Sequence, residues 1–338
     1  MKIFILNTLG IGLDAIDLIS RQIEISGIIG LSNREENDTI SDYVYQHEFC
    51  RLKKIDFIET DSYTLSNELD KKKILALNID VLIVSGWQRL IPDWLINHCS
   101  ICAIGAHGSP LGITKGRGRS PQNWALILGL KSFHISIFKI DTGIDSGQII
   151  DTRSFTYSDF DDIKTSYYKV CLLTAHMIID KLNDPDFIKQ KFEQQNEALA
   201  EYFPKRIPAD GIIDWSGSNM QIRNIVRAQT KPYPGALSYI NDCKIKIWSV
   251  IPFEIEIKQK YETGVIVKIF NRNDILVKTK DSFMLIDNYQ KEREDFELKE
   301  GMQFKSSNFG TQMDKIIERH ETEYPNLPIS EIIKKERQ

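Results

Sequence analysis

Residues 101–110 read ICAIGAHGSP, and this stretch decides the fold class of the chain. Its apolar first half predicts a buried strand of a parallel sheet, and His107 follows at the carboxyl end of that strand. Ligands of open α/β sheets bind at this edge. A single histidine is more often an ordinary core or surface residue, so His107 becomes informative only if a partner lies beside it.

A partner follows the next apolar segment, His134–Ile140, which ends in the acidic loop Asp141–Gly147. A strand beside the first one would bring Asp145 next to His107, and such a pair performs acid–base chemistry. Asp-Thr-Gly and Asp-Ser-Gly are also common turns, so spacing alone leaves a structural role open. Between the two segments, Lys115–Arg119 suits an anionic ligand, such as a folate glutamate tail or a nucleotide phosphate, or forms a solvated surface loop.

These motifs resemble the signature of the folate-dependent formyltransferase family: Asn-x-His-x-Ser, then Arg-Gly before a proline, then Asp-x-Gly-x-Asp-x-Gly. The matching segments here are Gly105–Ser109, Arg117–Trp124 and Asp141–Gly147. The resemblance implies transfer of a formyl group from 10-formyltetrahydrofolate, the co-substrate, to a primary amine. The family's asparagine, an oxyanion donor, falls on Gly105. A catalytically lapsed protein that keeps a folate or nucleotide pocket is therefore an alternative hypothesis.

The resemblance also implies roles for individual residues. His107 would hydrogen-bond the developing oxyanion and exchange protons, while Asp145 would orient His107 and help to accept the proton of the amine. These two are the expected catalytic residues, and no metal ligands are expected. Cofactor binding is expected at Arg89, Leu90, Ile91, Ser109, Arg119 and Asp141, of which the first three lie where the family lines its pterin pocket.

The first residues predict a Rossmann-like α/β domain. Lys2–Leu6 is a short apolar strand, and Asp14–Arg21 has the apolar spacing of a helix, as has Ser62–Leu77 further on. Gly10-x-Gly12-x-x-Ala15 matches a relaxed dinucleotide fingerprint, so a nicotinamide or flavin enzyme is the rival interpretation. That fingerprint needs a carboxylate at the end of the second strand, but Ile25–Leu31 runs into polar residues instead, which favours a tight strand-to-helix turn.

With 338 residues and 42% hydrophobic content, the chain is long enough for two domains. The composition of Pro204–Gly211 predicts a linker, so residues 1–205 are expected to form the catalytic domain, with a mostly parallel sheet. Short strands separated by turns predict a small, OB-like β-barrel in residues 206–300. Residues 301–338 are expected to form a charged, mainly helical tail.

A second set of motifs bears on the formyl acceptor. Asp214-Trp215, Ile225–Ala228 and Pro232–Tyr239 look like the C-terminal domain shared by methionyl-tRNA formyltransferase and the formyltransferase half of the polymyxin-resistance enzyme ArnA. Arg117–Trp124 and Pro232–Tyr239 look more like the amino-sugar enzyme, so a nucleotide-linked amino sugar is the expected acceptor. The tRNA is less favoured, because Asn33–Thr39 is acidic-rich where tRNA-formylating members are expected to carry a basic loop.

Composition limits the partners further. A net charge of −4 gives no basic field across the whole molecule for a nucleic acid. Five cysteines, an odd number, in a chain without a signal peptide favour a reducing cytosol and hence a cytoplasmic protein. No apolar run approaches the roughly 20 residues of a membrane span, so no membrane partner is expected. The pair Cys99 and Cys102 lies on the approach to a buried strand and is not interpreted as a redox or zinc site. The sequence leaves open whether the chain forms a homodimer.

Overall fold

The computed structural model describes residues 1–34, 40 and 42–336. Most of the acidic-rich segment Asn33–Thr39 therefore lies outside the described residues. Residue contacts divide the chain into two compact units that alternate along the sequence. The first unit comprises Met1–Arg117, His134–Phe155 and Tyr167–Ala200, and the second comprises Gly118–Phe133, Thr156–Ser166 and Glu201–Gln338.

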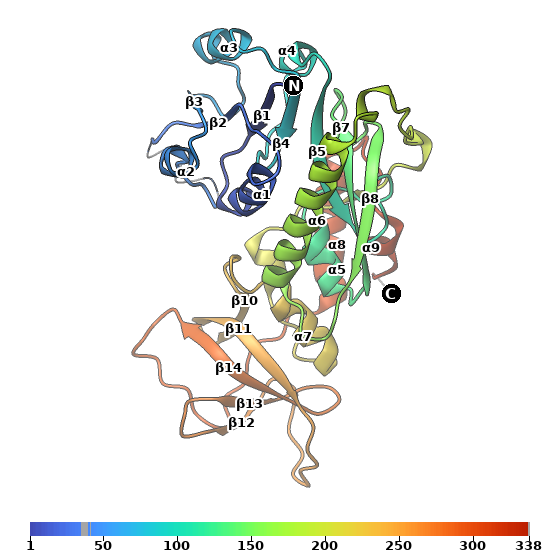
Figure 1. The fold of residues 1–338 in the computed structure, drawn as a ribbon. Helices are drawn as coiled ribbons and strands as arrows, with labels where there is room; N and C mark the ends of the chain where they lie inside the picture. Colours follow the sequence, from blue (N-terminus) through green and yellow to red (C-terminus); the bar gives the residue numbers. More distant parts are fainter. Residues whose placement is uncertain (35–39, 41, 337–338) are drawn as a thin grey trace. The chain divides into compact units, whose positions relative to one another are not determined.

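A seven-stranded sheet in the order β3-β2-β1-β4-β5-β7-β8 forms the centre of the first unit (Figure 1). Its strands are β1 (Ile3–Leu6), β2 (Gly27–Leu31), β3 (Phe57–Thr60), β4 (Val81–Val84), β5 (Cys102–Ser109), β7 (Ser132–Lys139) and β8 (Ile149–Thr156). The strands from β3 to β5 pair in parallel, and β7 pairs antiparallel with β5. The predicted α/β fold with a mostly parallel sheet is confirmed.

Helices and short 3-10 helices lie between the strands of this sheet or follow its last strand along the chain. They are α1 (Gly10–Ser20), α2 (His47–Lys53), α3 (Glu68–Leu75), α4 (Asp93–His98) and α6 (Ile163–Asn183), with the 3-10 helices η2 (Phe187–Lys189) and η3 (Glu197–Leu199). The strands β1 and β2 are buried along their whole length, as expected for parallel strands covered on both faces. Ile5 and Ile28 pair in register and are 0% exposed, and burial of each such side chain contributes about 1.5–3 kcal/mol.

Two helix boundaries differ from the sequence prediction. The helix predicted from Asp14 begins at Gly10, because the amide of Ile11 donates to Asp42 Oδ2 at 2.8 Å, a cap from far along the chain. The helix predicted over Ser62–Leu77 is confined to α3. Here Asp70 Oδ2 accepts hydrogen bonds from the amides of Asp61 and Ser62, at 2.9 and 2.8 Å, and ties them into a loop. Local spacing carries no trace of either contact.

A five-stranded antiparallel sheet in the order β10-β11-β14-β13-β12 forms the second unit's main layer. Its strands are β10 (Ala236–Ile240), β11 (Cys243–Phe253), β12 (Ile266–Ile269), β13 (Ile275–Lys278) and β14 (Phe283–Lys291). The expected C-terminal antiparallel β domain is confirmed. Antiparallel bridges join Val265 with Gln303, next to β12, and Tyr239 of β10 with Lys305. The segment 303–305 thus connects the two edge strands, as a barrel requires.

The last residues pack onto the second unit. The remaining elements of the chain are β6 (Arg117–Gly118), α5 (Pro121–Ile127), β9 (Tyr202–Phe203), η4 (Pro208–Gly211), α7 (Asn219–Arg227), α8 (Phe309–Glu323) and α9 (Glu331–Lys335). The first amide of α8, at Phe309, donates to Asp214 Oδ2 at 2.9 Å. A parallel bridge joins Tyr202 with Ile329. Among the described residues, none of the helices combines the length and apolar content of a membrane span.

Candidate active site

The strand β5 runs past the end of its parallel neighbour. Register pairs Ile83 of β4 with Ile104, after which β4 ends at Val84 while β5 continues to Ser109. The extension is supported on its other side by β7, where His107 pairs with Ser136. His107 therefore lies at the carboxyl edge of the parallel strands, the same edge from which the loop after β4 departs.

His107 and Asp145 are brought together at this edge. Asp145 lies in the loop between β7 and β8, and its Oδ2 is 3.4 Å from His107 Nδ1. The other ring nitrogen, Nε2, is 2.7 Å from the carbonyl oxygen of Gly116. Since a carbonyl only accepts, Nε2 carries a proton, and Nδ1 then faces a carboxylate oxygen. The geometry therefore brings an imidazole nitrogen into contact with a carboxylate, the two kinds of group that acid–base chemistry uses.

The loop that carries Asp145 has a constrained shape. Asp141 Oδ1 accepts hydrogen bonds from Ser146 Oγ at 2.6 Å and from the amide of Gly143 at 3.1 Å. Asp145 has a φ of +51°, in the left-handed region that L side chains rarely adopt. A β-carbon on Gly147 would stand 1.6 Å from a main-chain oxygen of β7, so only glycine fits there.

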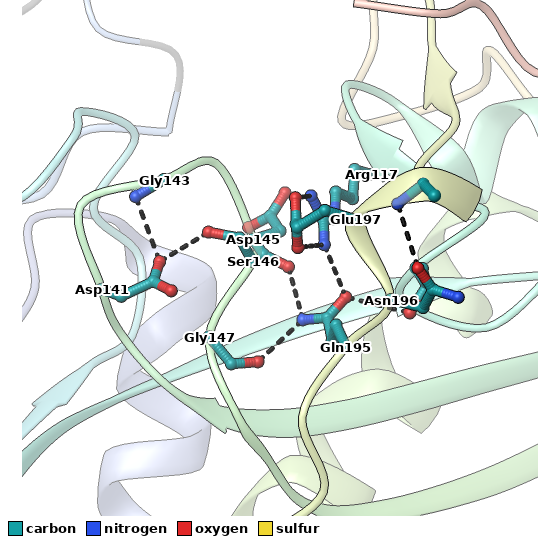
Figure 2. Close-up of polar contacts among 11 residues, drawn as sticks. Arg117, Asp141, Gly143, Asp145, Ser146, Gly147, Gln195, Asn196 and Glu197 are labelled. Carbon is teal, nitrogen blue, oxygen red and sulfur yellow. Dashed lines mark hydrogen bonds and ion pairs between the residues drawn. The ribbon is translucent and has the colours of Figure 1, made fainter.

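A buried amide supports the second half of this loop (Figure 2). Gln195 Nε2 donates to the carbonyl oxygens of Asp145 and Gly147, at 2.7 and 2.8 Å. Its Oε1 accepts from Arg117 Nη2 at 2.9 Å and from Thr114 Oγ1 at 3.0 Å. Gln195 was not among the predicted site residues, because a glutamine in a polar segment has no distinguishing sequence pattern.

The basic segment Lys115–Arg119 was expected to bind an anionic ligand or to form a solvated loop, but Arg117 does neither. Its side chain is 1% exposed and makes a fork of hydrogen bonds to Glu197, at 2.8 and 2.6 Å. The Arg117 guanidinium lowers the pKa of the Glu197 carboxyl through these bonds. An arginine buried in an ion pair is not offered to an anionic ligand, so of the three cations only Lys115 and Arg119, both exposed, remain for that role.

Gly105, the position of the family's asparagine, is covered by an aromatic ring. Gly105 pairs with Phe138 across β5 and β7, on the same face as His107. A β-carbon at Gly105 would lie 3.0 Å from Phe138 Cζ and 3.1 Å from Ile140 Cγ1. The backbone of Gly105 lies outside the left-handed region, so the obstacle to a side chain is the neighbouring atoms.

The segment expected to bind the pterin ring has one buried and two exposed residues. Ile91 is part of the apolar core, whereas Leu90 is 67% exposed. The Arg89 guanidinium carbon stands 4.6 Å from the centroid of the Tyr63 ring, a cation–π stack. This loop leaves β4 at the edge where β5 carries His107 onward.

The other residues expected to bind cofactor are placed differently. Ser109 is fully buried, and its hydroxyl accepts from the amide of Leu111 at 3.1 Å. Asp141 is exposed and bonded within its own loop. Arg119 belongs to the second unit, where its amide donates to the carbonyl of Phe203 at 3.1 Å. The contacts of Ser109 and Asp141 are with their own loops, and their expected cofactor roles stay predictions.

The dinucleotide interpretation fails at the start of α1. The amide of Ile11 is bonded to the Asp42 carboxylate, which takes the place a nucleotide phosphate would occupy. A β-carbon on Gly12 would stand 2.3 Å from Asn7 Oδ1, so this glycine is explained by close packing within the first turn.

The thiols give no sign of redox or metal chemistry in the residues described. Burial raises the pKa of Cys99 to about 12 and that of Cys102 to about 11. Both are free cysteines. Across the described part of the chain, no three His, Cys, Asp or Glu side chains gather closely enough to hold a metal ion.

Comparison with known proteins identifies two domains of one family. The formyl transferase model matches residues 18–181, and the model of the formyl transferase C-terminal domain matches residues 206–300. The bifunctional polymyxin resistance protein ArnA of Wigglesworthia glossinidia brevipalpis is 33% identical over 216 residues, which are 63% of this chain and 32% of ArnA. A methionyl-tRNA formyltransferase of Coxiella burnetii is 27% identical over 220 residues, 65% of this chain and 68% of that protein.

A solved structure with the same fold aligns with most of this chain. The N-formyltransferase from Helicobacter canadensis, in complex with folinic acid and dTDP-3-aminofucose, aligns with a TM-score of 0.58 at 16% identity. The alignment covers 86% of this chain and 99% of that one. The fold is therefore shared along nearly the whole length of that protein.

Proposed function

Because this chain belongs to the formyl transferase family, we propose that it transfers a formyl group from 10-formyltetrahydrofolate to the amine of a nucleotide-linked amino sugar. The observation that carries the proposal is the contact of 3.4 Å between His107 Nδ1 and Asp145 Oδ2 at the carboxyl edge of the sheet. The catalytic roles of His107 and Asp145 are part of the proposal.

Formyl transfer requires proton movement at two nitrogens. The attacking amine loses a proton, the folate nitrogen that departs gains one, and an oxyanion develops on the formyl carbon in between. 10-Formyltetrahydrofolate supplies the formyl carbon and the departing nitrogen. His107 and Asp145 hold a proton between Nδ1 and Oδ2, give it up to the departing nitrogen, and regain one from the amine. The pair ends as it began, and no other acid or base is needed.

The contacts of His107 determine which of its two ring nitrogens exchanges protons. Nε2 is committed to the Gly116 carbonyl at 2.7 Å, which fixes the ring and leaves Nδ1 as the edge that exchanges protons. Gly105 brings no side-chain donor for the oxyanion, so we assign this stabilisation to the Nδ1–H of His107, which turns to the oxyanion before the proton passes to the departing nitrogen. A loose contact of this kind in the ligand-free protein is expected to tighten when substrates bind.

Three observations support a nucleotide-linked amino sugar. ArnA shows 33% identity against 27% for the Coxiella enzyme, and the Helicobacter canadensis structure carries a dTDP-linked amino sugar. Lys115 is exposed and suits a phosphate group, and so, considered by itself in the second unit, does the exposed Arg119. The net charge of −4 does not favour a polyanion as large as tRNA. For the folate, the stacked Arg89 and the exposed Leu90 offer a surface to the pterin ring.

The proposal is tested by incubating the full chain with 10-formyltetrahydrofolate and a panel of amines. The panel holds nucleotide-linked amino sugars, free amino sugars and methionine-charged initiator tRNA, and the release of tetrahydrofolate and the mass of the product are measured. Release with a nucleotide-linked amino sugar supports the proposal. Release only with the charged tRNA makes the chain a methionyl-tRNA formyltransferase, and folate binding without any release makes it a lapsed binding protein.

A further inference from the structure

We propose that Gln195 is a positioning residue for Asp145, and that Arg117 and Glu197 in turn orient Gln195. The inference rests on the proposed function for the meaning of Asp145 as a catalytic carboxylate. The placement of Gln195 rests on contacts within the first unit alone.

The orientation of the Gln195 amide is unambiguous. Its oxygen faces the Arg117 guanidinium, which can only donate, and its nitrogen faces two carbonyl oxygens, which can only accept. Rotating the amide by half a turn would set donor against donor and acceptor against acceptor. The side chain is therefore locked in one direction by groups on both sides.

The Gln195 amide makes all four hydrogen bonds of which it is capable. Both N–H groups donate, to Asp145 and Gly147, and both lone pairs of Oε1 accept, from Arg117 and Thr114. Gln195 is 6% exposed, so water does not easily replace any of these bonds. A buried amide whose donors and acceptors are all satisfied rigidifies its surroundings.

Gln195 supports the loop at Asp145, the residue whose backbone conformation most needs support. The Asp141 carboxylate bonds the amide of Gly143 and the hydroxyl of Ser146, on either side of Asp145, and leaves the main-chain carbonyl of Asp145 to another partner. Asp145, with its φ of +51°, is in a conformation that persists only when the surroundings hold it. The Gln195 side chain bonds the main chain at Asp145 itself and at Gly147, as Figure 2 shows.

The segment Gly116–Arg117 holds both members of the proposed acid–base pair in position. The carbonyl of Gly116 accepts from His107 Nε2 at 2.7 Å, and the next residue, Arg117, bonds Gln195, which holds Asp145. The segment thus fixes the imidazole directly and the carboxylate through one intermediate side chain. The separation of Nδ1 and Oδ2 depends on it, and proton transfer depends on that separation.

The ion pair completes the arrangement. Arg117 is 1% exposed, and a buried cation needs a charged partner, which Glu197 provides through two hydrogen bonds. Asn196 Oδ1 accepts from the amide of Ala198 at 3.1 Å and caps the short helix η3, which begins at Glu197. The three consecutive residues 195–197 are therefore each held in place.

The test compares Gln195→Met with a matched control, Gln312→Met. Gln312 of α8 also donates its Nε2 to two backbone carbonyls, those of Ile212 and Ser307 at 2.9 and 3.0 Å, but it belongs to the second unit. We expect kcat for formyl transfer to fall about a hundredfold in Gln195→Met with KM little changed. The Gln312→Met variant should lose some thermal stability and keep its kcat.

Two further readouts separate positioning from a general loss of stability. In the Asp145→Asn background, Gln195→Met should remove little additional activity, because a residue that acts through Asp145 has nothing left to position. The ¹⁵N resonances of the His107 ring report the hydrogen bonds of both nitrogens without any substrate. The Nδ1 resonance should shift in Gln195→Met and remain unchanged in Gln312→Met.

The outcomes are distinct. If folded Gln195→Met keeps the kcat and the His107 resonances of the wild type, or if Gln312→Met changes them equally, Gln195 is not a positioning residue. If the wild type transfers formyl to no amine, the proposed function fails, and the Nδ1 resonance alone decides the role of Gln195. Should Gln195→Met not fold, Gln195→Asn replaces it: its amide is one methylene too short to reach both Arg117 and the loop, and the same shift is expected.

Discussion

The ring of Phe138 covers the backbone of Gly105, with its Cζ 3.0 Å from the point where a β-carbon on Gly105 would stand. Both residues share the face of the sheet that carries His107. The volume beside the proposed acid–base pair that the family gives to an asparagine thus borders on an aromatic side chain here. A side chain at position 105 can therefore fit only if the ring of Phe138 gives way.

Replacing Gly105 by asparagine is therefore expected to lower turnover. The new side chain must displace Phe138 or Ile140, and overpacking of this kind costs about 1–3 kcal/mol, which lowers the Tm by several degrees. Gly105→Ala, which adds the β-carbon without the amide, controls for the steric effect. The double variant Gly105→Asn/Phe138→Leu should recover turnover, since an oxyanion donor is worth about 3 kcal/mol. A single Gly105→Asn variant with higher turnover and an unchanged Tm would contradict this account.

His107→Ala and Asp145→Asn should each lower kcat by about two to four orders of magnitude, because each removes one member of the pair that moves the proton. Steady-state kinetics and circular dichroism would be measured on both, and both proteins should remain folded. His98→Ala is the control: this histidine also contacts a backbone carbonyl, that of Leu77 at 2.8 Å, but lies on α4. Activity near the wild-type level in either site variant excludes the proposed mechanism.

The Arg117–Glu197 pair predicts a pH dependence of stability. Because Arg117 lowers the pKa of Glu197 in the folded protein, the ionised carboxylate stabilises the fold above its unfolded pKa of about 4.3, and this contribution is lost as the pH falls through the lowered value. Urea unfolding at pH 7 and pH 3 should show a smaller difference in Glu197→Gln than in the wild type. Glu292→Gln breaks the pair with Lys244, whose side chain is 31% exposed where that of Arg117 is 1% exposed, and should change this difference less. Equal behaviour of the two variants would speak against a particular role for the Arg117–Glu197 pair.

The thiols are expected to be unreactive in the native protein. Burial raises the pKa of Cys50, Cys102 and Cys171 to about 11 and that of Cys99 to about 12, so almost no thiolate exists at pH 8. Titration with a disulfide reagent should give slow release from the folded protein and rapid release from all five cysteines in guanidinium. Fast labelling of the folded protein at pH 8 would show that one of these sites opens readily.

The acidic-rich segment Asn33–Thr39 predicts weak tRNA binding. Without a basic loop at this place, charged initiator tRNA should bind no better than bulk RNA at physiological salt, and the dependence of affinity on salt should be shallow. Filter binding over a salt series measures both. Tight and discriminating binding would move the acceptor assignment to tRNA.

Local patterns of apolar residues were sufficient to predict the strands that are buried along most of their length. The apolar runs at Lys2–Leu6 and His134–Ile140 were predicted close to the observed β1 and β7, and short strands were predicted in the part of the chain that holds β10 to β14. Two strands for which no local pattern was found, β3 and β8, stand at the ends of the seven-stranded sheet. Edge strands are half exposed, so their composition resembles that of loops.

For the site, the motif spacing and the family resemblance pointed to His107 and Asp145, and they lie in contact. The residues that hold them could not be found in this way. Gln195 is separated from Asp145 by 50 positions, and its contact is with main-chain oxygens, which carry no side-chain signature. The start of α1 was misplaced for the same reason, since its cap at Asp42 comes from 31 positions away.

The strand-like segment at residues 303–305 sets a limit on how the chain can be shortened. The match to the C-terminal family domain ends at residue 300, so a fragment based on that match would also end at residue 300. Such a fragment would lose the bonds from the amide of Lys305 to Tyr239 and from that of Phe304 to Gly264, at 2.7 and 2.9 Å. Two edge strands would then present unpaired amides and carbonyls to solvent, and exposed edges of this kind template aggregation. A fragment meant to remain soluble and monomeric must extend at least through Lys305.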